Sequence, residues 1–209
     1  MKKLFIAFAF LLSTQLSYAQ YDPDARAVLD AMSEKYKSFE AFAAGFKQEF
    51  TNENAGIDES MSGEIIVKDN QYVLDIAGQK IYNDGNEMWR YDEEMAEVTV
   101  TINEPEEQEI SMNNIFDLYK DGFKYILMGQ NQRGERMIEL DPITKDKSYY
   151  KIKMVIDKND MLKNFSVLER SGNTYKYIIE DFKTMKDVSA ETFAFNVGDF
   201  PNVEVVDFR

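Results

Sequence analysis

Apolar residues recur at every second position in many short segments of this chain, and this period of two is the feature that most constrains its fold. Four segments show it: Phe42, Ala44, Phe46 and Phe50; Tyr72, Leu74 and Ile76; Ala96, Val98, Val100 and Ile102; and Tyr150, Ile152, Met154 and Ile156. Successive side chains of a β-strand point to opposite faces, so each segment is predicted to be a strand with one buried and one wet face. The chain is therefore expected to be mainly antiparallel β-sheet.

Turn-forming residues separate these alternating runs. Residues 68–70, 83–86, 157–160 and 171–173 are rich in Asp, Asn, Gly and Ser. Such residues favour the tight turns of β-hairpins. The segment 157–160 has some likeness to a calcium-binding loop, but it lacks the Gly and the distal Glu of that motif, so we interpret it as a turn.

Two further segments have the period of an α-helix. Asp22 and Pro23 suit a helix cap and a first helical position, and the apolar spacing after them predicts an amphipathic helix over 23–37. Ser111 can cap a second, short helix that ends near Gly122. One face of this helix would carry Met112, Ile115, Phe116 and Tyr119. From periodicity alone, that face could either cover a cleft or belong to a permanently packed helix.

The elements together predict an α+β fold that is mainly β. We expect a strongly curved antiparallel sheet or unclosed barrel, accompanied by two or three short helices. No repeat, low-complexity linker or change in composition divides the chain, so a single domain is predicted over residues 20–209.

The first nineteen residues have the pattern of a cleaved signal peptide. Lys2 and Lys3 precede an apolar run over Leu4–Leu12, and Ser17 and Ala19 place small residues where a signal peptidase reads. The apolar run is much shorter than the roughly 20 residues that span a bilayer. We therefore predict cleavage after Ala19 and export to the periplasm. The chain has no Cys that could be lipidated, so it should be free there.

The residue types that are missing exclude most catalytic and metal chemistry. The chain has no His and no Cys, which removes imidazole bases, thiol nucleophiles and the metal sites built from these ligands. It also lacks the nucleophile-elbow, dinucleotide and P-loop motifs. A carboxylate pair could still act, but most carboxylates are surface charges. We expect no catalytic residue, no metal site and no cofactor.

Charge limits the possible partners. The formal net charge of −14 repels nucleic acid and anionic lipid headgroups. Any membrane component must then be reached through a protein partner or through apolar contacts. The acidic run Glu104–Glu109 could dock a basic partner, but we interpret it as a solvated loop, because runs of like charge usually are.

Large apolar residues are abundant, with 15 Phe, 12 Tyr and 11 Met. Met adapts to variable neighbours, as a site for disordered acyl chains would need. An ordinary core uses the same residues, and composition alone favours that reading.

Several segments match motifs that one known protein family shares. Gly63–Lys68 is similar to its G-x-[LI]-x-[VF]-K strand, Tyr72–Leu74 to its aromatic-rich strand, and Asn83–Tyr91 to its S-D-G-x-x-[LV]-W-x-Y hairpin. Lys37–Phe46 is similar to the family's link between first helix and first strand, and Pro201–Asp207 to its closing strand. The chain therefore resembles the LolA family, periplasmic carriers of outer-membrane lipoproteins, over nearly its whole length after the signal peptide.

This resemblance implies an unclosed antiparallel β-barrel whose concave apolar face is covered by a lid of short α-helices. Lipoprotein acyl chains would lie in the cleft, without a cofactor. In the family's cycle an inner-membrane ABC-type complex releases the lipoprotein to the carrier, which hands it to an outer-membrane acceptor or to the membrane itself. We expect a monomer that binds no nucleic acid.

Strand parity and the matched motifs together select the site residues. The expected lipid-binding cleft consists of Phe46, Phe50, Ile65, Val67, Tyr72, Leu74, Trp89 and Tyr91. The expected lid consists of Met112, Ile115, Phe116 and Tyr119. The side of the sheet that carries Trp89 and Tyr91 stays open, because Met88 and Arg90 occupy the other face and a bulge would exchange them.

The chain departs from the family at one position. The family commonly follows Val-Lys with Arg-Pro, and that arginine latches the lid by hydrogen bonds, whereas this chain has Asp69-Asn70 after Val67-Lys68. A carboxylate cannot donate those bonds. The lid is therefore expected to rely mainly on apolar contacts.

Two other functional classes remain as alternatives. A periplasmic sensor of lipids or mislocalised lipoproteins could use the same fold, and would be expected to have a further domain or a membrane anchor. An enzyme that acts on lipids or glycans through carboxylates is the third class, and the missing residues and motifs disfavour it.

Overall fold

The computed structural model describes residues 22–104, 110 and 112–209. The expected signal peptide over 1–19, most of the acidic run (105–109) and the expected cap residue Ser111 lie outside this range. Among the described residues, no helix is long and apolar enough to cross a membrane.

One twelve-stranded sheet forms the body of the molecule, in the order β12-β6-β5-β4-β3-β2-β1-β11-β10-β9-β8-β7. The strands are β1 (Ala41–Asn52), β2 (Ile57–Lys68), β3 (Gln71–Ile76), β4 (Gln79–Asn83), β5 (Glu87–Asp92), β6 (Glu97–Ile102), β7 (Phe123–Gln130), β8 (Arg136–Pro142), β9 (Tyr149–Ile156), β10 (Leu162–Glu169), β11 (Thr174–Met185) and β12 (Glu204–Asp207). Strands β7 and β12 form the two edges and do not pair with each other, so the barrel is not closed. This confirms the predicted fold class.

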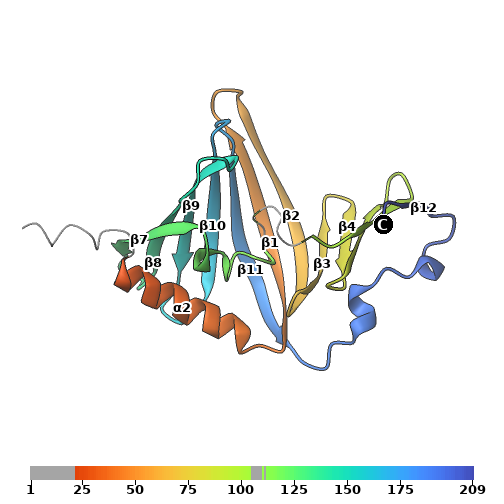
Figure 1. Cartoon of the computed structure of the whole chain (residues 1–209), viewed down its shortest axis with the longest axis horizontal. Helices are drawn as coiled ribbons and strands as arrows, with labels where there is room; N and C mark the ends of the chain where they lie inside the picture. Colours follow the sequence, from red (N-terminus) through yellow and green to blue (C-terminus); the bar gives the residue numbers. More distant parts are fainter. Residues whose placement is uncertain (1–21, 105–109, 111) are drawn as a thin grey trace, which may run out of the picture.

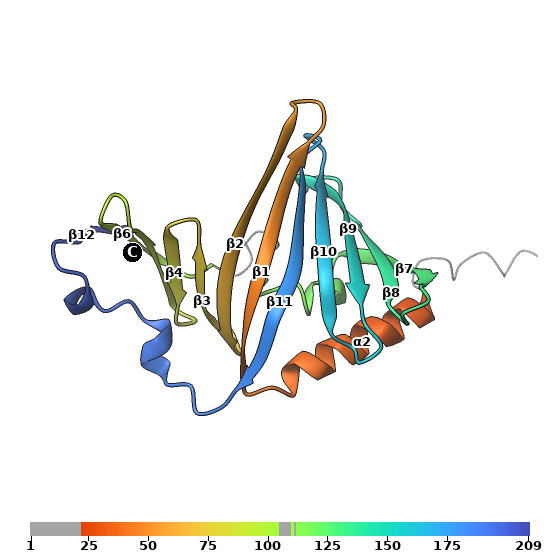
Figure 2. The same ribbon diagram turned by 180° about the vertical axis from the view of Figure 1, so that it is seen from behind.

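The sheet curves about its long central strands, as Figures 1 and 2 show. We call β7–β11 the helix wing, because helix α2 (Pro23–Lys37) lies across it, and β3–β6 with β12 the open wing. Neighbouring strands are antiparallel except for β12, which pairs with β6 in parallel. The segment expected to be a closing strand thus forms an edge of the open wing.

The predicted turns all join paired strands. Residues 68–70 connect β2 to β3, 83–86 connect β4 to β5, 157–160 connect β9 to β10, and 171–173 connect β10 to β11. The last two turns are closed by their own backbone and side-chain hydrogen bonds. Hairpin chemistry therefore set the connections of the sheet locally.

Helix α2 (Pro23–Lys37) begins where the sequence predicts. One carboxylate oxygen of Asp22 accepts hydrogen bonds from the backbone N–H groups of Asp24 and Ala25, at 2.9 and 3.3 Å. The other oxygen accepts from the backbone N–H of Leu127 in β7 at 2.9 Å. The cap thus also fixes the start of the helix to the helix wing. The helix buries its apolar stripe, Ala25, Val28, Leu29, Met32 and Tyr36, toward the concave side of the sheet.

The second predicted helix is not an α-helix. Residues 112–117 form consecutive turns, followed by the 3₁₀ helix η2 (Leu118–Lys120). So short a segment gains few hydrogen bonds for the cost of nucleating an α-helix, and its Asn and Asp side chains compete for the backbone. The expectation of a lid made of short α-helices is therefore wrong for this segment. Its four apolar residues are nevertheless all buried.

The C-terminal residues 186–203 run along the outside of the open wing before they reach β12 (Figure 2). Two 3₁₀ helices, η3 (Ala190–Phe193) and η4 (Val197–Asp199), lie in this segment. Phe193 is fully buried in a small second cluster with Ala41 and Val188. The C-terminal segment and the convex face of the sheet thus form a second apolar cluster, separate from the concave core.

Gly63 in β2 makes room for an aromatic ring of the core. A Cβ atom at this position would lie 2.7 Å from Cζ of Phe46 and 2.8 Å from the backbone oxygen of Asp75. Real Cβ atoms do not approach so closely, so we expect Gly63→Ala to lower the free energy of unfolding by about 1–3 kcal/mol. Urea denaturation measures the change. Gly45→Ala is the matched control, because its Cβ would meet nothing closer than 3.7 Å. Equal effects of the two variants would contradict this packing.

Candidate functional site

The register of the strands defines the concave face of the sheet. Phe42 lies opposite Val67, which lies opposite Tyr72, and all three are buried. Directly opposed residues share a face. A residue is therefore concave if it lies opposite a member of this row. It is also concave if it lies an even number of positions from such a residue along a strand that no bulge interrupts.

Six of the eight expected cleft residues lie on this face. Phe46, Ile65, Val67 and Tyr72 are buried there, while Phe50 and Leu74 are partly exposed. They come from β1, β2 and β3, which pair without a register shift. The alternation of the sequence thus brought these six side chains together.

Trp89 and Tyr91 lie on the opposite, convex face. Trp89 pairs with Tyr82 and Val100, and Tyr91 pairs with Lys80 and Val98. No bulge interrupts β3–β6, so the parity is fixed. The C-terminal segment covers this face, with the ring of Phe195 at 5.7 Å from that of Tyr91. The structure therefore does not bring these two residues together with the other six.

The chain's single Trp consequently reports on the convex face. We expect a saturating long-chain lipid to leave the emission spectrum of Trp89 nearly unchanged, because the ring is separated from the concave face by the sheet. Fluorescence titration, with binding followed in parallel by calorimetry, tests this. A large spectral shift on binding would contradict this placement.

The helix wing supplies concave residues that the sequence motifs did not indicate. These are Tyr125, Ile138, Leu140, Ile152, Met154, Phe165, Val167, Tyr175, Tyr177 and Ile179. The alternation of apolar and polar residues in these strands could have indicated which side chains share a face. No family motif, however, linked these strands to the binding site. A bulge in β11, where Asp181 has a φ of 44°, additionally turns Phe182 onto the Phe42 ring at 5.3 Å. A bulge of this kind leaves little trace in the sequence.

Residues 112–120, which we call the covering segment, pack over the concave face beside α2. The Phe116 ring stacks on Tyr36 with 3.8 Å between ring centroids and meets Phe42 edge-on at 5.7 Å. Met112, Ile115 and Tyr119 are buried in the same cluster. The segment thus occupies apolar surface of the sheet and helix that would otherwise be open.

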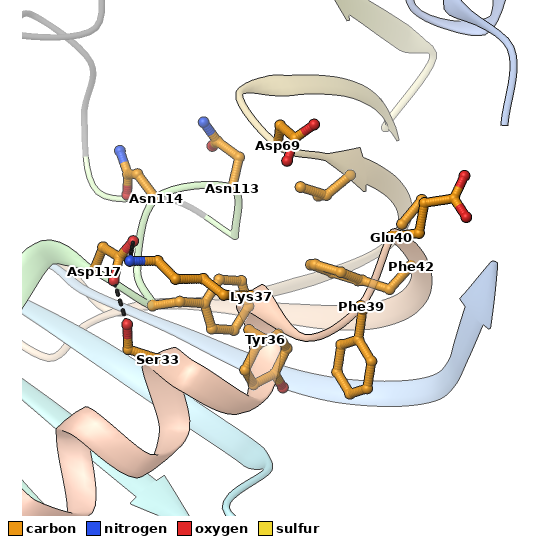
Figure 3. A pocket seen from close by; sticks show the side chains of 13 residues that line it. Ser33, Tyr36, Lys37, Phe39, Glu40, Phe42, Asp69, Asn113, Asn114 and Asp117 are labelled. Atoms are coloured by element: carbon orange, nitrogen blue, oxygen red, sulfur yellow. Dashed lines mark hydrogen bonds and ion pairs between the residues drawn. The ribbon is translucent and has the colours of Figure 1, made fainter. Parts of the chain in front are cut away.

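Polar contacts also hold the covering segment, which the sequence analysis missed. Oδ1 of Asp117 accepts a hydrogen bond from Ser33 Oγ at 2.5 Å (Figure 3). The same oxygen accepts from Lys120 Nζ at 2.5 Å, and Oδ2 pairs with Lys37 Nζ at 3.2 Å. The hydroxyl of Tyr119 donates to Asp30 Oδ1 at 2.5 Å. Polar contacts therefore add to the expected apolar ones, because the segment supplies an acceptor, Asp117, to donors on α2.

These contacts shift the acidity of the groups involved. Burial alone would raise the pKa of Asp117, but the hydrogen bonds from Lys120, Ser33 and Lys37 outweigh it, so the pKa is lowered. Burial and the Asp30 carboxylate raise the pKa of Tyr119. At neutral pH, Asp117 is therefore the charged carboxylate that accepts hydrogen bonds, and Tyr119 is the neutral phenol that donates one.

Among the described residues, cavities border the covering segment or the concave face of the sheet. The first, of about 510 Å³, lies between the end of α2, the start of β1 and the end of β2 (Figure 3). Its walls include Phe116, Phe42, Val67 and Asp69. A second, of about 490 Å³, lies at the far end of the segment beside Tyr119 and Tyr125. A third, of about 210 Å³, is lined by Tyr149, Tyr175 and Tyr177. Asp69, which replaces the family's arginine, thus faces the first cavity.

The concave face is suited to binding apolar groups. Within the described ranges, no group of three or more His, Cys, Asp or Glu side chains could hold a metal ion. The polar groups at the cavities serve to attach the covering segment, while the surface beneath it is apolar. Such a surface can bury hydrocarbon without directional contacts.

Comparison with known proteins agrees with this geometry. The profile of the family described as outer membrane lipoprotein carrier protein LolA matches residues 37–196. An outer-membrane lipoprotein carrier protein of Haemophilus ducreyi is 28% identical over 183 residues, covering 80% of this chain and 79% of the relative. One of Actinobacillus pleuropneumoniae is 26% identical over 203 residues, covering 94% and 90%.

A solved structure supports the fold alone. The crystal structure of an uncharacterised conserved protein from Thermus thermophilus superposes with a TM-score of 0.59 at 11% identity, covering 88% of this chain and 99% of that one. Because the family profile spans most of the chain, the chain belongs to the LolA family of outer membrane lipoprotein carrier proteins.

Proposed function

We propose that this protein carries lipoproteins from the inner to the outer membrane by holding their acyl chains against the concave face of the sheet. The observation that carries this proposal is a continuous apolar face in an unclosed sheet, covered by helix α2 and the covering segment. A short segment can leave that face, whereas a complete layer could not.

The energetics favour a cover that competes with the cargo. Burying acyl chains is favourable by roughly 0.8 kcal/mol per CH₂, so a long chain would bind too tightly to be released from an empty, fully fitted cleft. In the empty protein the covering segment buries Phe116 and its neighbours on the same surface. Displacing them offsets part of the gain from cargo, which keeps release possible.

The structure supports assigning roles to particular residues in this proposal. Phe46, Phe50, Ile65, Val67, Tyr72 and Leu74 would contact the acyl chains, and Met112, Ile115, Phe116 and Tyr119 would act as the lid. Trp89 and Tyr91 are omitted, because they face the other side.

The proposed cycle begins with an inner-membrane ABC-type complex and ends at an outer-membrane acceptor or at the membrane itself. The carrier would act as a periplasmic monomer after removal of residues 1–19, and would catalyse no reaction. Its acidic surface disfavours direct adsorption to anionic headgroups, so transfer would depend on partners and on apolar contacts.

The direct test uses the protein from residue 20 onward and a synthetic triacylated lipopeptide. We expect a one-to-one complex by native mass spectrometry, and no complex with the same peptide after removal of its acyl chains. Depletion in cells should strand outer-membrane lipoproteins in the inner membrane. Equal binding of both peptides, or normal sorting with no second carrier present, would contradict the carrier function.

A further inference from the structure

One cation stands at the end of an apolar row on the concave face. Arg90 in β5 pairs with Ile81, Ile81 with Leu74, and Leu74 with Ile65. Because directly opposed residues share a face, all four point to the concave side. Exposure rises along the row, from 1% at Ile65 through the partly exposed Leu74 and Ile81 to the exposed Arg90. Three strand spacings separate the ends, roughly 14 Å.

The electrostatics of Tyr72 agree with this placement of Arg90. Burial raises the pKa of Tyr72, while a hydrogen bond with Asn83 and the positive charge of Arg90 act in the opposite direction. Tyr72 is a buried concave residue. The charge of Arg90 therefore acts on a buried residue of the concave face.

Other basic residues of the open wing have partners in the fold. Lys80 pairs with Asp75 at 3.0 Å, and Arg209 pairs with Glu87 at 2.7 Å and with Asp207 at 2.5 Å. Arg90 makes no ion pair or side-chain hydrogen bond within residues 22–104, 110 and 112–209. Its guanidinium donors are thus available to a ligand that enters the cleft.

We propose that Arg90 is a specificity-determining residue that binds the oxygen-rich head of a long-chain lipid whose hydrocarbon lies along the Ile65–Leu74–Ile81 row. This inference rests on the carrier function proposed above. Arginine presents a planar fork of donors that matches groups bearing only acceptors. The ester and amide carbonyls at the acylated end of a lipoprotein are such groups, and so is the phosphate of a phospholipid. The row gives the ligand its direction, with hydrocarbon toward the core and oxygen toward the open wing.

The experiment compares Arg90→Gln with the matched control Arg133→Gln, which removes the same charge from an exposed arginine in the β7–β8 turn. Three probes are titrated into each protein, which begins at residue 20. They are a triacylated lipopeptide with an uncharged peptide, dipalmitoyl phosphatidate, and 1,2-di-O-hexadecylglycerol, which has hydrocarbon chains but no carbonyl. Hydrogen bonds to a charged group predict that Arg90→Gln loses about tenfold or more in affinity for a head-bearing probe. The ether should lose less than about twofold, since its hydrocarbon contacts are unchanged. Arg133→Gln should change none of the three.

The probes also separate the sources of the head group. A loss for the lipopeptide assigns Arg90 to the lipoprotein head, and a loss confined to phosphatidate assigns it to a phospholipid. Arg90→Lys keeps the charge without the fork, so its loss should be intermediate. Unchanged affinity for both head-bearing probes, or an equal loss for the ether, would overturn the proposal. If the unmodified protein bound none of the probes, the carrier function itself would fail instead.

Discussion

Truncation of Phe116 to Ala is expected to lower the free energy of unfolding of the empty protein by about 3 kcal/mol without weakening its binding of acyl chains. Loss of a buried Phe side chain costs about 3–5 kcal/mol in a well-packed core, and the lower end suits a site that can open. The variant loses the stack on Tyr36 and the edge contact with Phe42. Because the covering segment is then easier to displace, the affinity for acyl chains should stay equal or rise.

Phe193→Ala is the matched control for this prediction. Phe193 is also fully buried, but it lies in the separate cluster on the convex face. We expect a similar loss of stability by urea denaturation and an unchanged affinity for the triacylated lipopeptide. A joint loss of stability and affinity in Phe116→Ala would show that Phe116 lines the site permanently, and would contradict a displaceable cover.

Asp117→Asn is expected to lower the unfolding free energy by about 1–2 kcal/mol at pH 7, and the difference from the unmodified protein should disappear in acid. Hydrogen bonds to charged groups contribute about 1.5–3 kcal/mol, and the half-exposed position of Asp117 reduces this by solvent screening. Its side chain is 48% exposed and meets Ser33 and Lys37 from α2 and Lys120 from its own segment. The substitution should also raise the affinity for acyl chains, because a more weakly attached covering segment competes less with them for the concave face.

The direction of the pH dependence follows from the lowered pKa of Asp117. A carboxyl group with a lowered pKa in the folded state stabilises the fold above its unfolded pKa of about 3.9, and loses this contribution as pH falls through the folded value. Denaturation of both proteins between pH 7 and pH 2 measures the difference. Asp121→Asn is the control, because Asp121 is exposed in the same loop. A difference that persists at pH 2 would mean that the charge of Asp117 does not attach the segment.

The strands and turns of this protein were predictable because they depend on local rules. Alternation at Phe42, Phe46 and Ile152 specifies which side chains a strand buries, whatever its neighbours are. The turn residues around Gly85 and Asp160 adopt positive φ values of 97° and 63°. The start of α2 at Asp22 is equally local, since its cap closes within three residues.

The covering segment shows where local rules fail. Met112, Ile115, Phe116 and Tyr119 have helical spacing and are all buried, but the backbone is not α-helical. Packing against Tyr36 and Phe42 decides the conformation of so short a segment, and propensity cannot compete with it. The motif around Trp89 likewise identified a hairpin but left open the side of the sheet that the ring occupies.

Side-chain parity and turn chemistry act between near neighbours, so the sequence alone predicts a strongly curved antiparallel sheet or open barrel preceded by a capped helix, and the resemblance to the family implies the unclosed barrel. The motifs also identified the family. Only the tertiary structure decided that Trp89 faces outward, that Asp117 meets Ser33 across 84 positions of sequence, and that Arg90 ends the concave row. Each of these depends on which strands and segments become neighbours in space, and parity within one strand carries no information about that choice.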